Sequence, residues 1–220
     1  MKKNNQFAIL GVGRFGQSIA RTLLENDCDV LCCDNDIDVI NEMANLGCHA
    51  VQADVTDTYV LEQFGINNFD IVIVGIGENM ESCILATMLA KDLGAKYVIA
   101  KAKNDIQKSI LEKVGADRVI LPERDMGTRI ANTLLANNII DYINLSEKFA
   151  LAEVESHEKW INKTIIESNI RAKYGINIVA IKRSDKIIVS PAPNETIRQK
   201  DILVVVGENE IIQKFSNSSN

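Results

Sequence analysis

The N-terminal part of the chain, up to Asn138, alternates short apolar segments with longer amphipathic ones. Some short segments, such as Ile71-Val72-Ile73-Val74, are continuously apolar, which is typical of strands covered on both faces in a parallel sheet. Longer segments, for example residues 16–26 and 81–93, predict helices. This alternation predicts right-handed crossovers and a doubly wound, Rossmann-type α/β sheet. The expected strands are residues 7–10, 29–34, 49–53, 70–75, 97–101 and 118–121.

The pattern changes near residue 140. Residues 130–138 predict a long amphipathic helix, and Ile139-Ile140-Asp141-Tyr142 continues from it into a connection. Beyond it we expect only one short helix, near residues 164–168, and a hairpin whose polar turn contains Ser184 and Asp185. The expected strands are residues 149–154, 177–183, 186–190 and 202–206. We therefore predict a Rossmann-type domain over residues 1–138, a crossover or linker over 139–146, and a small α+β domain over 147–217.

Charge and hydropathy argue against a nucleic-acid-binding, a membrane-spanning or a secreted protein. The net charge of the 220 residues is −6, and no basic run is present, which argues against a nucleic-acid partner. No apolar run reaches the roughly 18–20 residues of a membrane span. The first strand is expected from Phe7, which leaves no room for a signal peptide. These features predict a cytoplasmic protein that would reach a membrane only through a partner.

The five cysteines, Cys28, Cys32, Cys33, Cys48 and Cys83, form no CxxC pair and fall within apolar stretches. We interpret them as small buried thiols in a reducing compartment. A zinc or redox role is the alternative.

A glycine-rich segment, Gly11-Val12-Gly13-Arg14-Phe15-Gly16, follows the first predicted strand and opens the first helix. In such a motif Gly11 permits a tight turn, Gly13 lets phosphate approach the backbone, and Gly16 allows close packing of helix on strand. The helix N-terminus then offers N–H groups to an anion. Asp34 ends the second strand, where a carboxylate would accept hydrogen bonds from ribose hydroxyls. The same carboxylate would repel a 2′-phosphate, which disfavours NADP. Together these features predict a nucleotide site.

Other candidates follow the remaining strands at the same edge of the sheet, where doubly wound folds bind ligands. Asp54 would meet adenine or ribose, and Gly75-Ile76-Gly77 would lie against the ligand. Lys101 would reach phosphate. For each of these alone, a solvated loop residue is an equal alternative.

Two charged residues suggest what the nucleotide is. Arg14 lies inside the phosphate loop, where its planar guanidinium suits a terminal di- or triphosphate oxygen; the alternative is a surface arginine. Glu123 would either bind a divalent cation or begin a helix, and the residues alone favour the helix start.

No catalytic constellation stands out. The two histidines, His49 and His157, begin a strand and lie in a polar loop, and the sequence has no GxSxG, HExxH or Walker lysine motif. We therefore expect no enzyme. A small NAD(H)-dependent oxidoreductase or an NADH-sensing regulator is the alternative.

Three separated motifs resemble the RCK-domain regulatory subunits of bacterial Ktr and Trk potassium-transport systems, and the match is closest to the Ktr subunits. The resemblance covers nearly the whole chain and rests on residues 7–16 (FAILGVGRFG), 115–127 (GADRVILPERDMG) and 169–175 (NIRAKYG). It implies an octameric cytosolic ring, built from dimers, that docks on a membrane potassium-translocating subunit of the KtrB/TrkH type. Residues 130–142 would form the crossover helix that joins subunits.

The resemblance also implies ligands. ATP and ADP would compete for the N-terminal site, and ATP would favour the activating ring. Arg14 would contact the terminal phosphate of its own or of the neighbouring subunit, Asp34 the ribose and Asp54 the adenine. Glu123 would help hold Mg²⁺ or Ca²⁺ at the dimer interface, which reverses the interpretation of Glu123 as a helix start. The nucleotide site would comprise Gly11, Gly13, Arg14, Phe15, Gly16, Asp34, Asn35, Asp54, Val55, Gly75, Ile76, Gly77, Lys101 and Glu123.

Relatives in this family bind cyclic di-AMP in the C-terminal domain. The matching positions here are Ile165, Ile166, Asn169, Arg171, Ala172, Asn177, Ile178 and Pro193. From the residues alone, an ordinary small core with one exposed arginine, Arg171, is the simpler interpretation. The chain departs from the family at Cys32-Cys33, where relatives usually carry small aliphatic residues.

Overall fold

A computed structural model describes residues 5–135, 139–146 and 148–217. The chain divides into two compact units, Met1–Glu123 and Arg124–Asn220. Each unit has its own sheet, and each is described separately below.

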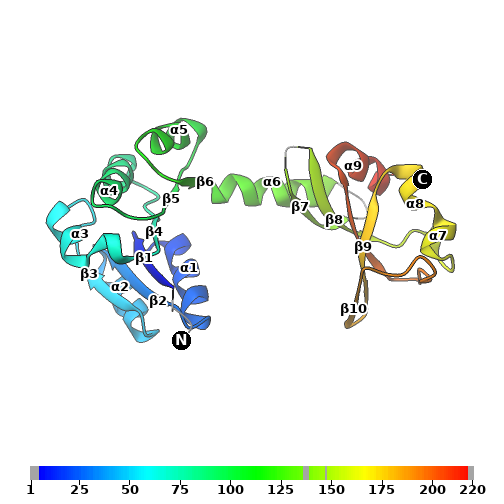
Figure 1. The fold of residues 1–220 in the computed structure, drawn as a ribbon, viewed down its shortest axis with the longest axis horizontal. Coiled ribbons are helices and arrows are strands. Elements are labelled where there is room, and N and C mark those ends of the chain that lie inside the picture. Colours follow the sequence, from blue (N-terminus) through cyan, green and yellow to red (C-terminus); the bar gives the residue numbers. More distant parts are fainter. Residues whose placement is uncertain (1–4, 136–138, 147, 218–220) are drawn as a thin grey trace. The chain divides into compact units, whose positions relative to one another are not determined.

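The first unit is built on a six-stranded parallel sheet with the order β3-β2-β1-β4-β5-β6 (Figure 1). The strand order reverses between β1 and β4. The loops that follow these two strands therefore run in opposite directions, and this is where doubly wound folds bind ligands. The strands are β1 (Gln6–Leu10), β2 (Asp29–Asp34), β3 (His49–Gln52), β4 (Ile71–Val74), β5 (Val98–Lys101) and β6 (Arg118–Ile120).

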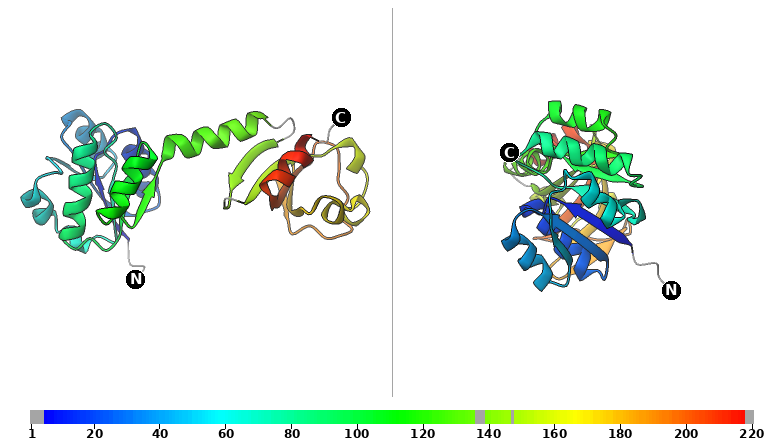
Figure 2. Two further views of the ribbon diagram at one scale, coloured as in Figure 1. Left: turned by 90° about the horizontal axis from the view of Figure 1, so that it is seen from above. Right: turned by 90° about the vertical axis from the view of Figure 1, so that its left-hand side faces the viewer.

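Helices cover both faces of this sheet (Figures 1 and 2). They are α1 (Arg14–Glu25), α2 (Ile37–Asn45), α3 (Thr58–Phe64), α4 (Met80–Asp92) and α5 (Asp105–Lys113), with a short 3-10 helix η1 (Ile66–Asn68) after α3. The side chains of Asp36, Asp57, Asn79 and Asn104 cap the N-termini of α2 to α5 by accepting a backbone N–H.

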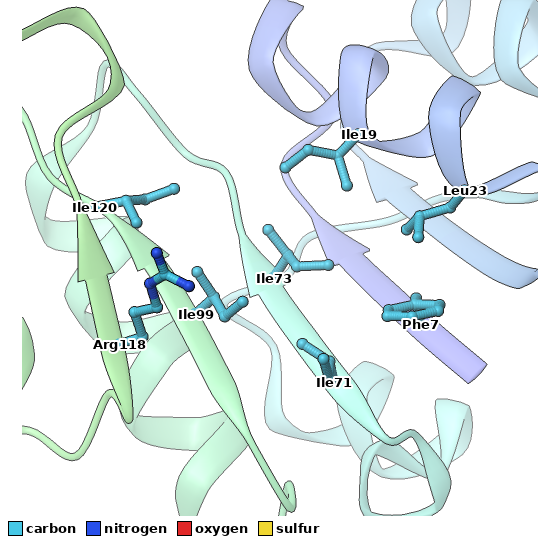
Figure 3. A pocket seen from close by; sticks show the side chains of 8 residues that line it. All are labelled: Phe7, Ile19, Leu23, Ile71, Ile73, Ile99, Arg118 and Ile120. Carbon is cyan, nitrogen blue, oxygen red and sulfur yellow. The ribbon is translucent and has the colours of Figure 1, made fainter. Parts of the chain in front are cut away.

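The two faces have separate cores. Ile9 and Cys32 pack with Ala20 of α1 and Met43 of α2 on one face. Beside α1 this face holds an apolar pocket of about 300 Å³ (Figure 3), lined by Phe7, Ile19, Leu23, Ile71, Ile73, Ile99, Arg118 and Ile120. The opposite face packs β1, β4 and β5 against α3, α4 and α5.

The second unit contains a five-stranded antiparallel sheet with the order β10-β9-β11-β8-β7. Trp160, Ile181 and Leu203 are among the buried residues of its core. The strands are β7 (Ile139–Asn144), β8 (Phe149–Glu155), β9 (Asn177–Arg183), β10 (Lys186–Val189) and β11 (Ile202–Glu208). The helical elements are α6 (Pro122–Leu135), which starts at the end of the first unit, η2 (Glu158–Trp160), α7 (Ile165–Ser168), α8 (Ile170–Tyr174) and α9 (Asn209–Asn217). The predicted fold class, a Rossmann-type sheet with a small α+β domain, is confirmed.

Two predicted elements are wrong, and the second unit contains α8 and α9 where only the short helix near residues 164–168 was expected. The crossover helix expected over residues 130–142 begins earlier, at Pro122, and Ile139–Asn144 is strand β7. Proline suits the first helical turn, and the isoleucine-rich run pairs with β8 and buries Tyr142 against Ala152. Residues 136–138 of the expected helix lie outside the described residues. The domain limits 1–138 and 147–217 stay a prediction, although most of the expected linker, 139–146, is strand.

An ion cluster around the buried Asp201 holds together part of the second unit. Asp201 is 1% exposed and accepts hydrogen bonds from Arg183 Nε at 2.9 Å and from Arg183 Nη2 at 2.8 Å. Arg183 also donates to Glu195 and to the carbonyl of Thr196, both at 2.8 Å. Through these contacts the guanidinium fastens the 195–201 loop to strand β9, and the hydrogen bonds with Asp201 raise the pKa of Arg183 above its ordinary value.

In the described parts of the chain no helix combines the length and apolarity that a membrane crossing requires.

Candidate functional site

The glycine-rich turn between β1 and α1 is held by backbone contacts that admit no side chain. Gly11 has a φ of 86°, in the left-handed region, and donates its N–H to the carbonyl of Cys33 at 2.9 Å. A Cβ on Gly16 would lie 2.7 Å from the carbonyl oxygen of Gly11, and one on Gly75 would lie 2.5 Å from the same oxygen. The ends of β1, α1 and β4 therefore meet at a spacing that only glycine allows.

Gly13 faces open space. It occupies the N-cap position of α1 with a φ of −66°, and a Cβ built on it would meet nothing within 4 Å. No side chain caps this end of α1, and its first turn carries no acidic residue. The unpaired N–H groups and the positive end of the helix dipole are thus available to an anion.

Asp34 is fixed at the end of β2 by two backbone N–H groups. Its Oδ2 accepts a hydrogen bond from Val12 N at 2.6 Å, and its Oδ1 accepts one from Asp36 N at 3.0 Å. The first of these bonds links the carboxylate directly to the glycine-rich turn. Each carboxylate oxygen retains acceptor capacity for a hydroxyl donor such as a ribose.

Lys101 and Glu123 form an ion pair at the ends of β5 and β6. Lys101 Nζ lies 2.6 Å from Glu123 Oε1 and 5.7 Å from the ring centroid of Phe15. The lysine side chain is 12% exposed and the glutamate 69%. The hydrogen bond from Lys101 lowers the pKa of Glu123 below its usual value. A Cβ on Gly77 would lie 3.6 Å from this ammonium, so the charge lies beside the expected ligand loop.

The remaining nucleotide-site candidates divide into two groups. Asn35 and Asp54 are exposed at the ends of β2 and β3, which are neighbours in the sheet, and Asp54 accepts hydrogen bonds from Thr56 N at 2.8 Å and Thr56 Oγ1 at 2.7 Å. Those bonds lower the pKa of Asp54. Val55 is buried in the core and Ile76 packs against that core, so their side chains serve packing.

Sequence reasoning placed Lys101 and Glu123 in the site one at a time and did not predict their pairing. The signal was present, because both residues follow parallel strands that are neighbours if the strands pair in order. Arg14 is exposed, and among the described residues it forms no hydrogen bond or ion pair. Glu123 lies in the first turn of α6, as the residues alone suggested.

The candidates in the second unit gather around the short helices α7 and α8. Ile166 donates its backbone N–H to the carbonyl of Pro193 at 3.0 Å, which joins α7 to the 193–195 loop. Asn169, with a φ of 52°, makes the turn between the two helices. Ile165 and Ile178 pack against the core of this unit. The exposed members are Ile166, Asn169, Arg171, Ala172, Asn177 and Pro193.

Comparison with known proteins identifies the family. The TrkA-N domain model matches residues 7–122, and the TrkA-C domain model matches residues 149–219. "Ktr system potassium uptake protein C" of Bacillus subtilis is 47% identical over 215 residues, which cover 98% of this chain and 96% of that protein. The chain belongs to the RCK-domain family of Ktr/Trk regulatory subunits.

A second relative supports the family assignment, and a solved structure supports the fold. "Ktr system potassium uptake protein A" of the same organism is 43% identical over 98% of this chain and 97% of that protein. A solved structure of the GsuK RCK domain superposes with a TM-score of 0.68 at 18% identity, over 100% of this chain and 48% of that one. That likeness concerns the fold alone.

Proposed function

We propose that this chain is a non-enzymatic regulatory subunit of a potassium-uptake system whose first unit binds ATP or ADP. The observation that carries the proposal is the open, uncapped N-terminus of α1 at Gly13, together with Asp34 bound to Val12 N and the Lys101 ammonium beside Phe15. The names of the two Bacillus subtilis relatives, both potassium uptake proteins, support the regulatory setting.

In the proposed complex the ribose would lie on Asp34 and the adenine near Asn35 and Asp54. The phosphates would extend along the N-terminus of α1 toward Lys101. Arg14, exposed at the first position of α1, would reach the terminal phosphate. Because the planar guanidinium binds phosphate oxygens in pairs, it would distinguish a triphosphate from a diphosphate.

Glu123 would contribute a carboxylate to Mg²⁺ or Ca²⁺ beside the phosphates. Within the described residues no group of three or more histidine, cysteine, aspartate or glutamate side chains is arranged to hold a metal ion. The remaining ligands would therefore be phosphate oxygens, water or a second subunit. In the proposed complex Glu123 would turn from Lys101 to the cation, and the phosphate would take its place on the lysine.

Arg14→Ala is expected to reduce the preference for ATP over ADP about tenfold, because a hydrogen bond to a charged group contributes roughly 1.5–3 kcal/mol. Affinity for ADP should change little. The measurement is calorimetric titration of the purified chain with each nucleotide. Arg21→Ala, on the exposed face of the same helix and paired with Glu42, is the matched control and should retain the preference.

Unchanged selectivity in Arg14→Ala would remove the proposed contact while leaving the nucleotide site in place. Binding of NADH without either adenine nucleotide would contradict the proposal more deeply. It would favour the NADH-sensing regulator or the small oxidoreductase, and turnover of NADH with a small carbonyl substrate would decide between these two.

For the second unit we propose cyclic di-AMP as the ligand. The exposed Arg171 would bind a phosphate, and Ile166, Ile165 and Ile178 would pack against adenine. Arg171→Ala is expected to weaken binding at least tenfold, whereas Lys173→Ala, an exposed cation on the same short helix, should have a small effect. Equal losses in the two variants would show a diffuse charge effect and contradict the assigned contact.

Assembly completes the proposal. Met126, Ile130 and Leu134 are exposed and recur every four residues along α6, so they form one apolar stripe. We infer that a second copy covers this stripe, that dimers assemble into an octameric ring, and that the ring docks from the cytoplasm on a KtrB/TrkH-type membrane subunit. Each ligand would regulate uptake by binding one ring conformation better than another.

A further inference from the structure

Two cysteines of the first unit lie with their sulfur atoms in direct contact. Cys32 is in strand β2, and Cys48 immediately precedes strand β3. Their Sγ atoms are 2.8 Å apart, and Cys48 Sγ also lies 3.1 Å from the carbonyl oxygen of Val30. The parallel register pairs Leu31 with His49, which places Val30, Cys32 and Cys48 on the same face of the sheet.

The neighbouring Cys33 is excluded from this pair. It points to the opposite face, where it packs in a different core, and its Sγ lies 3.6 Å from the carbonyl oxygen of Ala53. Cys32 is fully buried, while Cys48 is 8% exposed. Both residues are thus buried, and of the two only Cys48 retains some contact with solvent.

We propose that Cys32 and Cys48 form a peroxide-oxidisable dithiol that closes to an intrachain disulfide. A disulfide requires a sulfur–sulfur distance of about 2.05 Å, so the two atoms need only a small further approach. All five cysteines of the chain are free thiols in the structure, and this pair is the one with a hydrogen bond between the two sulfurs.

The chemistry begins at Cys48. The hydrogen bond shared with Cys32 lowers the pKa of the Cys48 thiol and raises that of Cys32, while burial opposes ionisation of both. The Cys48 thiol loses its proton, and the thiolate sulfur forms a bond to one oxygen of hydrogen peroxide as the O–O bond breaks. Hydroxide leaves and takes up that proton as the first water, so Cys48 becomes a sulfenic acid. The Cys32 thiol then attacks this sulfur, and its proton departs with the hydroxyl as water. In total two thiols lose two electrons, peroxide gains them, and two waters form.

The disulfide would close a loop between positions 16 apart in the sequence. That loop contains Cys33, Asp34, Asn35 and helix α2, which include two of the candidate ribose and adenine contacts. The modification would thus covalently fix the segment that presents Asp34. Its formation does not depend on which ligand that segment binds.

The test is a thiol count and a peptide map of the whole chain. The reduced protein is treated with hydrogen peroxide, alkylated under denaturing conditions, digested without reductant and analysed by mass spectrometry. We expect the count of free thiols to fall by two from five, a cross-link between the peptides that hold Cys32 and Cys48, and recovery of both thiols with dithiothreitol.

Three variants assign the bond. Cys33→Ala should still lose two thiols, which distinguishes Cys32 from its neighbour in the same peptide, whereas Cys32→Ala and Cys48→Ala should form no internal cross-link. The wild-type map decides the question even if a variant folds poorly. An unchanged thiol count, a cross-link through Cys28 or Cys33, or a sulfinic acid on Cys48 without a cross-link would overturn the proposal.

Discussion

Gly75→Ala is expected to destabilise the first unit by about 1–3 kcal/mol and to abolish nucleotide binding. The added Cβ would lie 2.5 Å from the carbonyl oxygen of Gly11, a distance that real Cβ atoms essentially never show. Gly75 N also donates to the carbonyl of Leu10 at 2.8 Å, so neither β4 nor β1 can yield without loss of strand pairing. Because Gly75 lies outside the left-handed region, the clash accounts for the effect without backbone strain. Urea denaturation and an ATP titration measure the two losses.

Gly13→Ala is the matched control for this prediction. Its Cβ would meet nothing within 4 Å, and its φ of −66° suits any residue, so stability should remain close to that of the wild type. Nucleotide affinity should nevertheless fall, because the methyl group would stand where phosphate approaches the helix N-terminus. If Gly75→Ala proved as stable as Gly13→Ala, the close approach of Gly75 to the carbonyl of Gly11 would not limit the size of the side chain at position 75. That result would contradict the prediction.

Asp201→Asn is expected to destabilise the second unit by about 3 kcal/mol, because it removes the buried charge opposite Arg183 and leaves that guanidinium, 20% exposed, with Glu195 as its remaining ionic partner. Asp201 is 1% exposed and receives two hydrogen bonds from Arg183, so solvent cannot replace the lost charge. Asp185→Asn, in the exposed turn between β9 and β10, removes the same charge and is the matched control, with little effect expected. Thermal or urea denaturation compares them.

The pH dependence of the same variant provides a second readout. Burial favours the protonated acid, but the hydrogen bonds from Arg183 and from Arg198 N outweigh it, so the pKa of Asp201 is below its ordinary value. The unfolded chain, with a carboxyl pKa of about 3.9, then binds more protons than the folded chain in this range. The stability from Asp201 is present above pH 4 and is lost as the pH falls below it. Asp201→Asn should lose less stability on acidification than the wild type, and parallel curves would contradict the assignment.

Local sequence patterns were enough to predict the parts of the candidate site that depend on strand ends and on the spacing of glycines. The turn at Gly11 and the position of Asp34 follow from a strand–loop–helix pattern that determines its own geometry. The pairing of Lys101 with Glu123 required the order of strands in the sheet, and the contact between Cys32 and Cys48 required the register as well. Strand β7 was interpreted as a connection from the residues and as the end of the crossover helix from the family resemblance, because its pairing with β8 is invisible in local periodicity. Helix α9 was missed altogether.

The attachment of the glycine-rich turn to Asp34 bears on how ligands would be told apart. Val12 N and Asp36 N already hold the carboxylate in the structure, so the turn is preorganised before any ligand arrives. Because the contact is already formed, the protein loses little conformational entropy there when a ligand binds. The contact also treats alike all adenosine-containing molecules whose ribose hydroxyls are free, since each offers Asp34 the same donors. Discrimination among such molecules would therefore depend on the phosphate end of the ligand. There Arg14 is exposed, and Lys101 would exchange the carboxylate of Glu123 for a phosphate.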